Sequence, residues 1–184
     1  MTLVMDKPST TDSKPEPEAL LDSLELPPGY QAELIEGDLV VSPAPTAEHQ
    51  QFLMKIIRPM VIADWDPHSD VGVTITAETY FIPDLTVVPR DFVFSNPKGS
   101  WQSPVGVEMV VEVTSSNPDK DRGAKLRAYA QVGIPLYLLI DRDRKESVLF
   151  SEPKDGEYAT SSRRALGEPI PLPEPFSFAL EDIR

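Results

Sequence analysis

The sequence contains no cysteine and only two histidines, His49 and His68. Without cysteine, the chain has neither a disulfide framework nor a thiolate metal site, so a metal ion would be bound by oxygen atoms or by a histidine. Hard cations such as Mg²⁺, which prefer oxygen ligands, are therefore the natural candidates.

Long hydrophobic runs and a secretory leader are also missing. The apolar stretch from Ile134 to Ile140 is far shorter than the roughly 20 residues that span a bilayer. The N-terminus has no basic segment followed by an apolar one. We therefore expect a cytoplasmic protein without a membrane contact.

Positive charge is scarce, because 17 lysines and arginines face 30 acids and the formal net charge is −13. Affinity for a phosphate backbone comes mostly from lysine and arginine, so this balance excludes an extended basic clamp for nucleic acid. A metal site needs local acid, however, and one basic face is enough for a transient DNA contact.

At 184 residues, the chain is long enough for one domain of ordinary size and a tail. Residues 1–17 are rich in proline, serine, threonine and charge, and they have too few apolar side chains to order themselves. We therefore predict a disordered acidic tail over residues 1–17 and a single domain over residues 18–184.

The first part of the domain predicts a hairpin and a helix. Tyr30 to Ser42 forms two short strand-like runs around Gly37, which can adopt the turn conformation that other residues resist. Thr46 is a suitable cap for a helix that runs to about Ala63 and carries apolar side chains at helical spacing.

The middle of the chain predicts three strands. Val71 to Tyr80 and Asp84 to Val88 are rich in β-branched residues, and prolines mark their limits. Val105 to Val113 is the most apolar run, which is typical of a central strand covered on both faces.

A second helix is signalled by Asn117 as its cap and Pro118 at its first position, and it is expected to end near Gly133. The strand Ile134 to Asp141 follows it, and hairpin-like sequence continues to the C-terminus. A strand, helix, strand succession implies a parallel pair joined by a right-handed crossover. The predicted fold class is thus α/β, a mixed β-sheet flanked by helices with β-hairpins at both ends.

Asp84 and Glu112 are the first candidates for chemistry. Asp84 begins a strand, and Glu112 lies near the end of an apolar strand, where an unpaired ionised acid is expensive to bury. A metal ion between the two carboxylates would remove that cost. The alternative is that Asp84 caps a turn and Glu112 pairs with a lysine or arginine.

Lys125 is the third candidate, because it follows Asp121 by four residues on the predicted helix and so faces the same way. It could form an ordinary surface ion pair with Asp121. It could instead reach the strand edge, orient a nucleophilic water and stabilise developing negative charge. The spacing does not decide between these alternatives.

Other polar residues favour structural interpretations. His49 could be a general base or a group that binds a metal ligand, but we expect it to be solvated or to cap its helix. We expect Glu33 to be an acid on a strand face. The basic residues around the second predicted helix form either a phosphate-facing patch or a solvated face: Lys120, Arg122 and Arg127.

Together these pieces resemble the Uma-type restriction endonuclease family, a branch of the PD-(D/E)xK nuclease superfamily. The resemblance is carried by PDLTVV from Pro83, by VVEVTSSNPDKDRGAKLRAYAQVGIPLYLLID from Val110 to Asp141, and by YQAELIEGDLVVSPAP with His49 upstream. It covers roughly Tyr30 to Phe150. It implies a curved mixed sheet flanked by helices, with metal-binding acids on adjacent strands.

The resemblance makes Asp84 and Glu112 metal ligands, with the Val113 carbonyl as a further ligand, and makes Glu36 the supporting acid of the N-terminal hairpin. The superfamily's usual lysine lies two residues after the glutamate, where this chain has Thr114. The resemblance assigns that role to Lys125.

The expected function is therefore a Mg²⁺-dependent DNA endonuclease, with Mn²⁺ as an alternative ion. By resemblance, we also expect it to act as a homodimer. Two alternatives stay open: a catalytically degenerate nuclease-fold protein that binds a partner, and a hydrolase of a smaller phosphoester.

Overall fold

The computed structural model describes residues 17–184 except 36, 44, 98, 100 and 115–117. Residues 1–16, which make up nearly all of the predicted tail, and the predicted cap Asn117 lie outside the described residues. The predicted tail and domain boundary therefore stay predictions. The first described element begins at Pro17.

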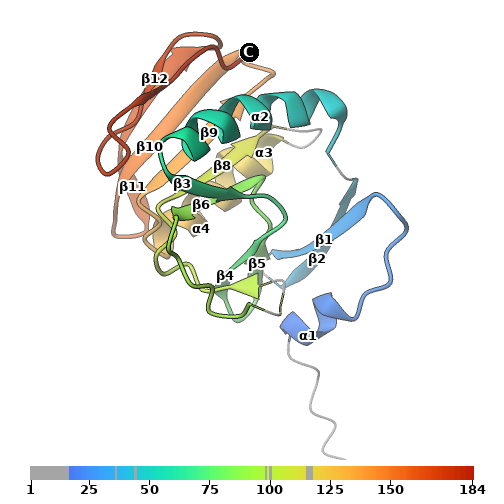
Figure 1. Ribbon diagram of the computed structural model, residues 1–184. Coiled ribbons are helices and arrows are strands. Elements are labelled where there is room, and N and C mark those ends of the chain that lie inside the picture. The colour runs from blue at the N-terminus through green and yellow to red at the C-terminus, as the bar shows by residue number, and fades with distance from the viewer. Residues whose placement is uncertain (1–16, 36, 44, 98, 100, 115–117) are drawn as a thin grey trace, which may run out of the picture.

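The described residues form two mixed sheets, a two-stranded ribbon and helices (Figure 1). The five-stranded sheet has the order β2 (Asp38–Pro43), β1 (Tyr30–Ile35), β5 (Thr79–Phe81), β4 (Gly72–Thr76), β7 (Trp101–Gln102). The six-stranded sheet has the order β11 (Glu157–Ala165), β10 (Glu146–Lys154), β9 (Leu136–Asp141), β8 (Met109–Val113), β6 (Leu85–Pro89), β3 (Trp65–His68). The ribbon and helices are β12 (Ile170–Pro171), β13 (Ala179–Leu180), α1 (Pro17–Asp22), α2 (Ala47–Ile62), α3 (Pro118–Lys120), the π-helical segment η1 (Asp121–Lys125) and α4 (Leu126–Gln131).

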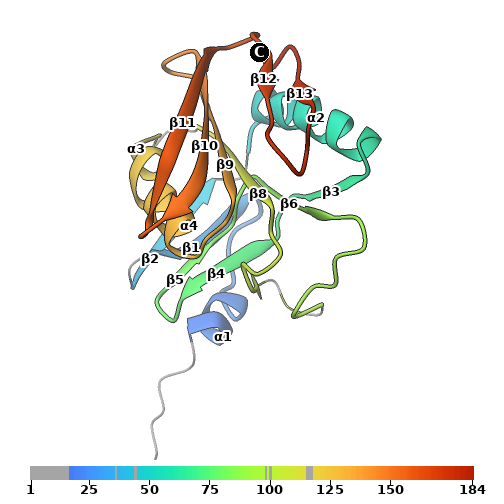
Figure 2. The same cartoon turned by 90° about the vertical axis from the view of Figure 1, so that its left-hand side faces the viewer.

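The predicted fold class is confirmed, since mixed sheets are flanked by helices. The N-terminal hairpin is β1 and β2, and Thr46 caps α2 by accepting a hydrogen bond from the main-chain N–H of His49 at 3.3 Å. β8 is central, between β6 and β9, and it runs parallel to β9 as the predicted crossover requires. Figure 2 shows the long β10–β11 hairpin at the edge of this sheet.

Two predicted strands differ from the structure. Residues 71–80 form a hairpin of β4 and β5, because residues 77 and 78 turn and the Glu78 N–H donates to Thr76 Oγ1 at 3.2 Å. The strand predicted over 105–113 begins only at Met109. Gly106, with φ +85°, adopts a left-handed conformation that interrupts the extended chain before it.

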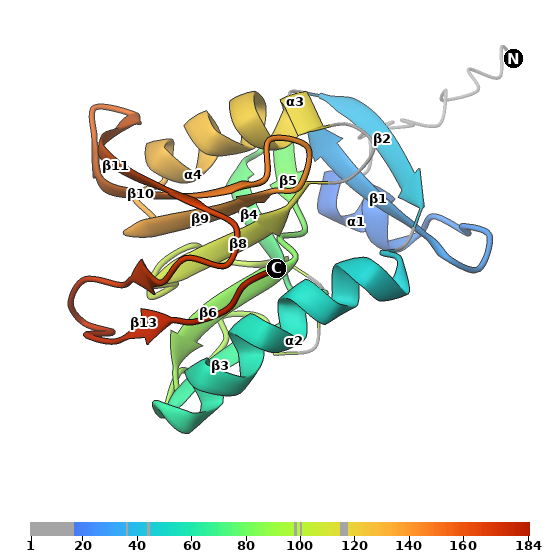
Figure 3. The same cartoon turned by 90° about the horizontal axis from the view of Figure 1, so that it is seen from above.

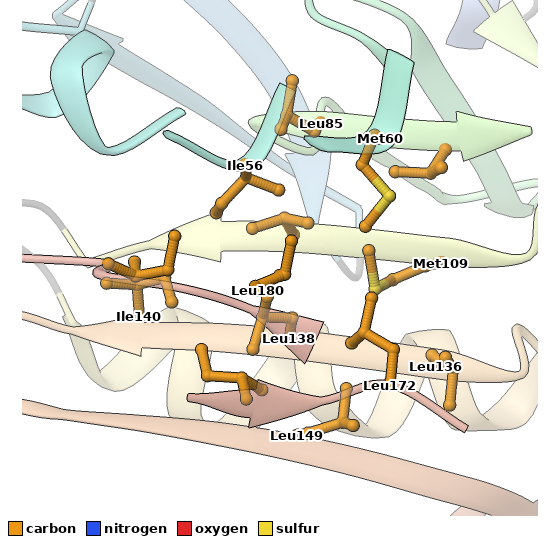
Figure 4. Close-up of a cluster of buried hydrophobic side chains, with 14 of the residues drawn as sticks. Ile56, Met60, Leu85, Met109, Leu136, Leu138, Ile140, Leu149, Leu172 and Leu180 are labelled. Atoms are coloured by element: carbon orange, nitrogen blue, oxygen red, sulfur yellow. The ribbon is translucent and has the colours of Figure 1, made fainter. Parts of the chain in front are cut away.

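Alternation along the strands of the six-stranded sheet separates two apolar cores. α2 and α4 cover opposite faces of that sheet (Figure 3). On the α2 face, Ile56 and Met60 pack onto Leu85, Met109 and sheet neighbours, with residues of the β12–β13 ribbon completing the layer (Figure 4). This packing and the direct pairing of β6 with β8 hold the ends of these strands side by side.

Candidate active site

The site forms where β1, β6, β8 and the segment 118–131 meet. β6 and β8 are antiparallel, with Leu85 opposite Val111, so Asp84 lies beside the end of β8 that carries Glu112. Glu112 faces the α4 side of the sheet, because its neighbours Val111 and Val113 belong to the core on the α2 side. The two acids predicted from the sequence, Asp84 and Glu112, therefore lie on adjoining chain segments, at the same end of two neighbouring strands of the six-stranded sheet.

Asp84 is held through a single oxygen. Its Oδ2 accepts a hydrogen bond from the Val113 N–H at 2.7 Å and lies 2.9 Å from Nε2 of His49. Within the described chain, Oδ1 has no hydrogen-bond partner. The carboxylate is therefore fixed in orientation and keeps one free oxygen.

Glu112 is buried and shares its Oε1 between two donors. The Lys125 ammonium donates to this oxygen at 2.7 Å and the Tyr129 hydroxyl donates to it at 2.6 Å. Its other oxygen, Oε2, accepts no hydrogen bond from any described residue. Glu112 thus resembles Asp84 in having one anchored and one free oxygen.

Glu33 of β1 joins the same group from the five-stranded sheet. Its Oε1 accepts from the Ile82 N–H at 3.0 Å and lies 3.3 Å from Nζ of Lys125, and its Oε2 pairs with Lys120. The side chain is only 8% exposed. Glu33 and Glu112 are therefore bridged by one buried lysine.

Asp121 and Lys125 occupy the first and last positions of η1. Their side chains approach to 3.9 Å, and the Tyr137 hydroxyl donates to the main-chain carbonyl of Asp121 at 2.9 Å. π-Helical turns inside helices are rare and frequent at functional sites. Here the π turn lies where the helix contributes its site residues.

We call Glu33, Asp84, Glu112 and Asp121 the acidic cluster. Burial raises the pKa of Glu112 well above its usual range, with Lys125 opposing this rise and Asp84 adding to it. Burial likewise raises the pKa of Asp121 to about 6. Among the described residues, these four carboxyl groups lie near the ammonium groups of Lys120 and Lys125. When all six groups are ionised, the site therefore carries two excess negative charges.

Lys125 and Glu33 stay charged. Burial acts to lower the pKa of Lys125, but the carboxylates of Glu112, Glu33 and Asp121 outweigh burial and raise it. Burial also acts to raise the pKa of Glu33, and Lys125 and Lys120 reverse the shift, so that it lies below its usual value. The cluster therefore holds a cationic Lys125 beside an anionic Glu33.

Comparison with known protein families places the chain in one of them. The sequence model of the Uma2 family, described as "Putative restriction endonuclease", matches residues 17–182. The chain belongs to the Uma2 family. The match spans every residue of the acidic cluster.

The fold is similar to that of a solved structure. A crystal structure of a "putative nuclease belonging to DUF820" from Anabaena variabilis matches with a TM-score of 0.67 and 16% identity. The match covers 89% of this chain and 96% of that chain. This likeness shows that the two share a fold. The comparison with curated proteins found no match.

The donor set of this Uma2 chain suits a hard divalent cation. No three histidine, aspartate or glutamate side chains among the described residues are grouped so as to hold a metal ion by themselves. Mg²⁺ usually keeps several waters and binds one or two carboxylates. The free oxygens of Asp84 and Glu112, within a cluster of four carboxyl groups, fit that mode of binding.

The structure places three of the predicted site residues together. Asp84, Glu112 and Lys125 meet at the cluster, and the Val113 N–H binds Asp84. Glu36 lies outside the described residues, so its predicted role stays a prediction. The notion that Lys125 forms a surface pair with Asp121 is wrong, because the Lys125 side chain is only 6% exposed.

Two other predictions from the sequence are corrected. His49 is neither solvated nor the cap of its helix, because it is buried against Asp84 and the cap is Thr46. Glu33 is more than an acid on a strand face, since it pairs with two lysines. The strand alternation could not indicate this role, because the partners of Glu33 follow it by 87 and 92 residues.

The basic residues near the second helix do not form a free patch. Lys120 pairs with Glu33, and Arg122 binds both oxygens of Asp141 at 2.7 Å. Arg127 is exposed and has no ion pair within the described part of the chain. No described helix is long and apolar enough to cross a membrane.

Proposed function

We propose that this Uma2 protein is a Mg²⁺-dependent endonuclease that hydrolyses phosphodiester bonds in DNA. The observation that carries the proposal is the acidic cluster, in which Asp84 and Glu112 each keep one oxygen that accepts no hydrogen bond from a described residue. Membership of the Uma2 family supports the reaction class.

Asp84 and Glu112 would hold the cation, with the Val113 carbonyl as a further oxygen ligand and water and phosphate oxygens completing its shell. When bound, Mg²⁺ would supply positive charge at the phosphate and lower the pKa of the attacking water. Mn²⁺ also prefers oxygen ligands and would serve as an alternative ion.

The protein residues have separate tasks in this proposal. Lys125 keeps Glu112 in one orientation and adds positive charge beside the place where negative charge develops on the phosphate. Tyr129 donates a second hydrogen bond to the same oxygen and so restrains its position. Glu36 remains the proposed supporting acid from the N-terminal hairpin.

The DNA backbone would reach the site along the β9–β10 turn, residues 142–145. This turn carries Arg142, Arg144 and Lys145, and the Arg142 N–H donates to Thr114 Oγ1 at 2.9 Å, two residues beyond Glu112. A hollow of about 720 Å³ lies between this turn and α2. Local positive charge beside an acidic site can offset the overall acidity of the protein.

We also propose an oligomeric state and a cellular location for the enzyme. A nuclease that cuts both strands needs two sites, and by resemblance to its superfamily we propose a homodimer. A cytoplasmic location, where the enzyme meets DNA, is part of the same proposal.

The decisive experiment is nicking of supercoiled plasmid by purified protein in Mg²⁺, with and without EDTA. We expect nicking in Mg²⁺ or Mn²⁺, none with EDTA, and none from Asp84→Asn or Glu112→Gln. The matched control is Asp155→Asn, an exposed acid in the β10–β11 turn, which should nick at the normal rate.

Other outcomes distinguish the alternatives. Metal-independent DNA binding without turnover would indicate a binding module built on a degenerate nuclease fold. Hydrolysis of a small phosphodiester such as bis(p-nitrophenyl) phosphate without plasmid nicking would indicate a smaller substrate.

A further inference from the structure

His49 lies in the first turn of α2 and contacts a residue far away in the sequence. Its main-chain N–H is fixed by the side chain of the helix cap, Thr46, and its ring reaches Asp84, 35 residues later. The residue is 4% exposed. The cap of α2 and the orientation of the ring therefore place Nε2 of His49 beside Asp84 of the acidic cluster.

We propose that His49 is a positioning residue for Asp84, which it orients toward the cation. This inference rests on the proposed function, because it requires a cation at Asp84. The histidine does not touch the ion or the substrate. It acts by holding Oδ2 of Asp84, so that Oδ1 is presented to the metal.

The hydrogen-bond geometry assigns a role to each ring nitrogen. Nε2 is 2.9 Å from Asp84 Oδ2, whereas Nδ1 is buried and has no hydrogen-bond partner among the described residues. A buried N–H without an acceptor is costly, so the hydrogen belongs on Nε2 and Nδ1 carries the lone pair. His49 therefore donates to Asp84 while leaving the negative charge of that carboxylate available for a cation.

Two hydrogen-bond donors on Oδ2 restrain the orientation of the Asp84 carboxylate. The Val113 N–H reaches Oδ2 from β8 and His49 reaches it from α2, so the carboxyl group is restrained from two sides. Hydrogen bonds to metal-ligating carboxylates orient them, and loss of such a partner typically costs about 10- to 100-fold in metal affinity or activity. A simple packing role for the imidazole would not change metal affinity by that amount.

The test measures Mn²⁺ binding directly, by calorimetry and by the electron spin resonance signal of free Mn²⁺, without substrate. His49→Leu removes the donor, and His49→Gln restores an N–H donor on a side chain of similar reach. We expect the dissociation constant for Mn²⁺ to rise about 10- to 100-fold in His49→Leu and to recover to within about threefold of the wild-type value in His49→Gln.

A matched control uses the other histidine. His68 lies on β3 and packs edge-on against Phe94, so His68→Gln should bind Mn²⁺ like the unchanged protein. His49→Met places an unbranched apolar side chain in the same space. It serves as the donor-free variant if His49→Leu fails to fold. Circular dichroism of each metal-free variant checks that the fold is retained.

The outcomes separate this inference from the proposed function. Wild-type Mn²⁺ affinity in a folded donor-free variant would overturn the role of His49 and leave the nuclease proposal intact. Mn²⁺ binding that depends on His49 in a protein that never nicks DNA would support the role of His49 and count against the nuclease. No Mn²⁺ binding by the unchanged protein would overturn both.

Discussion

Lys125 Nζ lies 2.7 Å from Glu112 Oε1, and both side chains are buried. The same nitrogen is 3.3 Å from Glu33 Oε1, so one ammonium bridges a strand of each sheet. A residue in this position stabilises the fold as well as the site, because removing it leaves two buried carboxylates without their shared partner.

The first prediction concerns the stability of Lys125→Ala. We expect the free energy of unfolding to fall by about 3 kcal/mol or more, because breaking a buried pair leaves an uncompensated charge. Urea denaturation at pH 7 with EDTA measures it. Lys154→Ala, an exposed lysine on β10, should change the value by less than about 0.5 kcal/mol. A cost below about 1 kcal/mol for Lys125→Ala would mean that the pair is open to solvent.

The second prediction concerns the pH dependence of the metal-free protein. Burial raises the pKa of Asp121 to about 6 from 3.8, so the folded state binds this proton more tightly than the unfolded chain. The associated stability is fully present below about pH 4 and is lost as the pH rises through about 6.

Asp121→Asn should remove this contribution, which is on the order of 2 to 3 kcal/mol between pH 4 and 7. Urea denaturation at several pH values with EDTA compares the variant with the unchanged protein. Asp119→Asn, whose side chain is 91% exposed, is the control and should keep the full pH dependence. Identical pH profiles for Asp121→Asn and the unchanged protein would contradict the prediction.

The sequence predicted those parts of the fold and site that depend on local patterns. The capped helix α2, the β1–β2 hairpin and the apolar strand β8 follow from periodicity and turn residues over short windows. The residues alone indicate that Glu112, an acid in an apolar run, requires a partner, and the family resemblance identifies Asp84 and Glu112 as a pair.

The rest could not be predicted, because it depends on contacts between distant residues. Glu33 meets Lys120 and Lys125 only after β1 packs beside the 118–131 segment, and His49 meets Asp84 only after α2 packs on the sheet. The π turn has no local signal either, since the pattern of residues 121–125 is that of an ordinary helix. These long-range contacts restrain the side chains around Asp84 and Glu112.

The third prediction concerns the ion pair that attaches η1 to β9. Arg122 donates from Nε and Nη2 to the two oxygens of Asp141, whose side chain is 1% exposed. Arg122→Ala should cost about 2 to 3 kcal/mol, because it leaves a buried carboxylate without its main donor. Arg122→Lys should recover less than half, since an ammonium cannot make the two parallel hydrogen bonds.

Thermal and urea unfolding measure this effect, and Arg127→Ala on the exposed side of the same segment is the matched control. The control should lose less than about 0.5 kcal/mol. If Arg122→Lys is as stable as the unchanged protein, the bidentate geometry is not the source of the stabilisation.

The last prediction concerns the β9–β10 turn as a contact for the DNA backbone. Arg144 and Lys145 are exposed there, next to Arg142, which is hydrogen-bonded to the strand beyond Glu112. Each phosphate contact by a lysine or arginine contributes about 0.9 to the slope of log K against log salt concentration on duplex DNA. The double variant Arg144→Ala/Lys145→Ala should therefore reduce the magnitude of that slope by about 1 to 2.

Fluorescence anisotropy of a labelled duplex, titrated with protein in EDTA at several NaCl concentrations, measures the slope without cleavage. The control Arg58→Ala/Lys154→Ala removes the same charge from α2 and from the far end of β10, where no contact is proposed. If the turn contacts phosphates, only the first double variant flattens the salt dependence. Equal flattening in both would mean that net charge, and not this turn, governs DNA binding, because loss of overall charge acts wherever the residues lie.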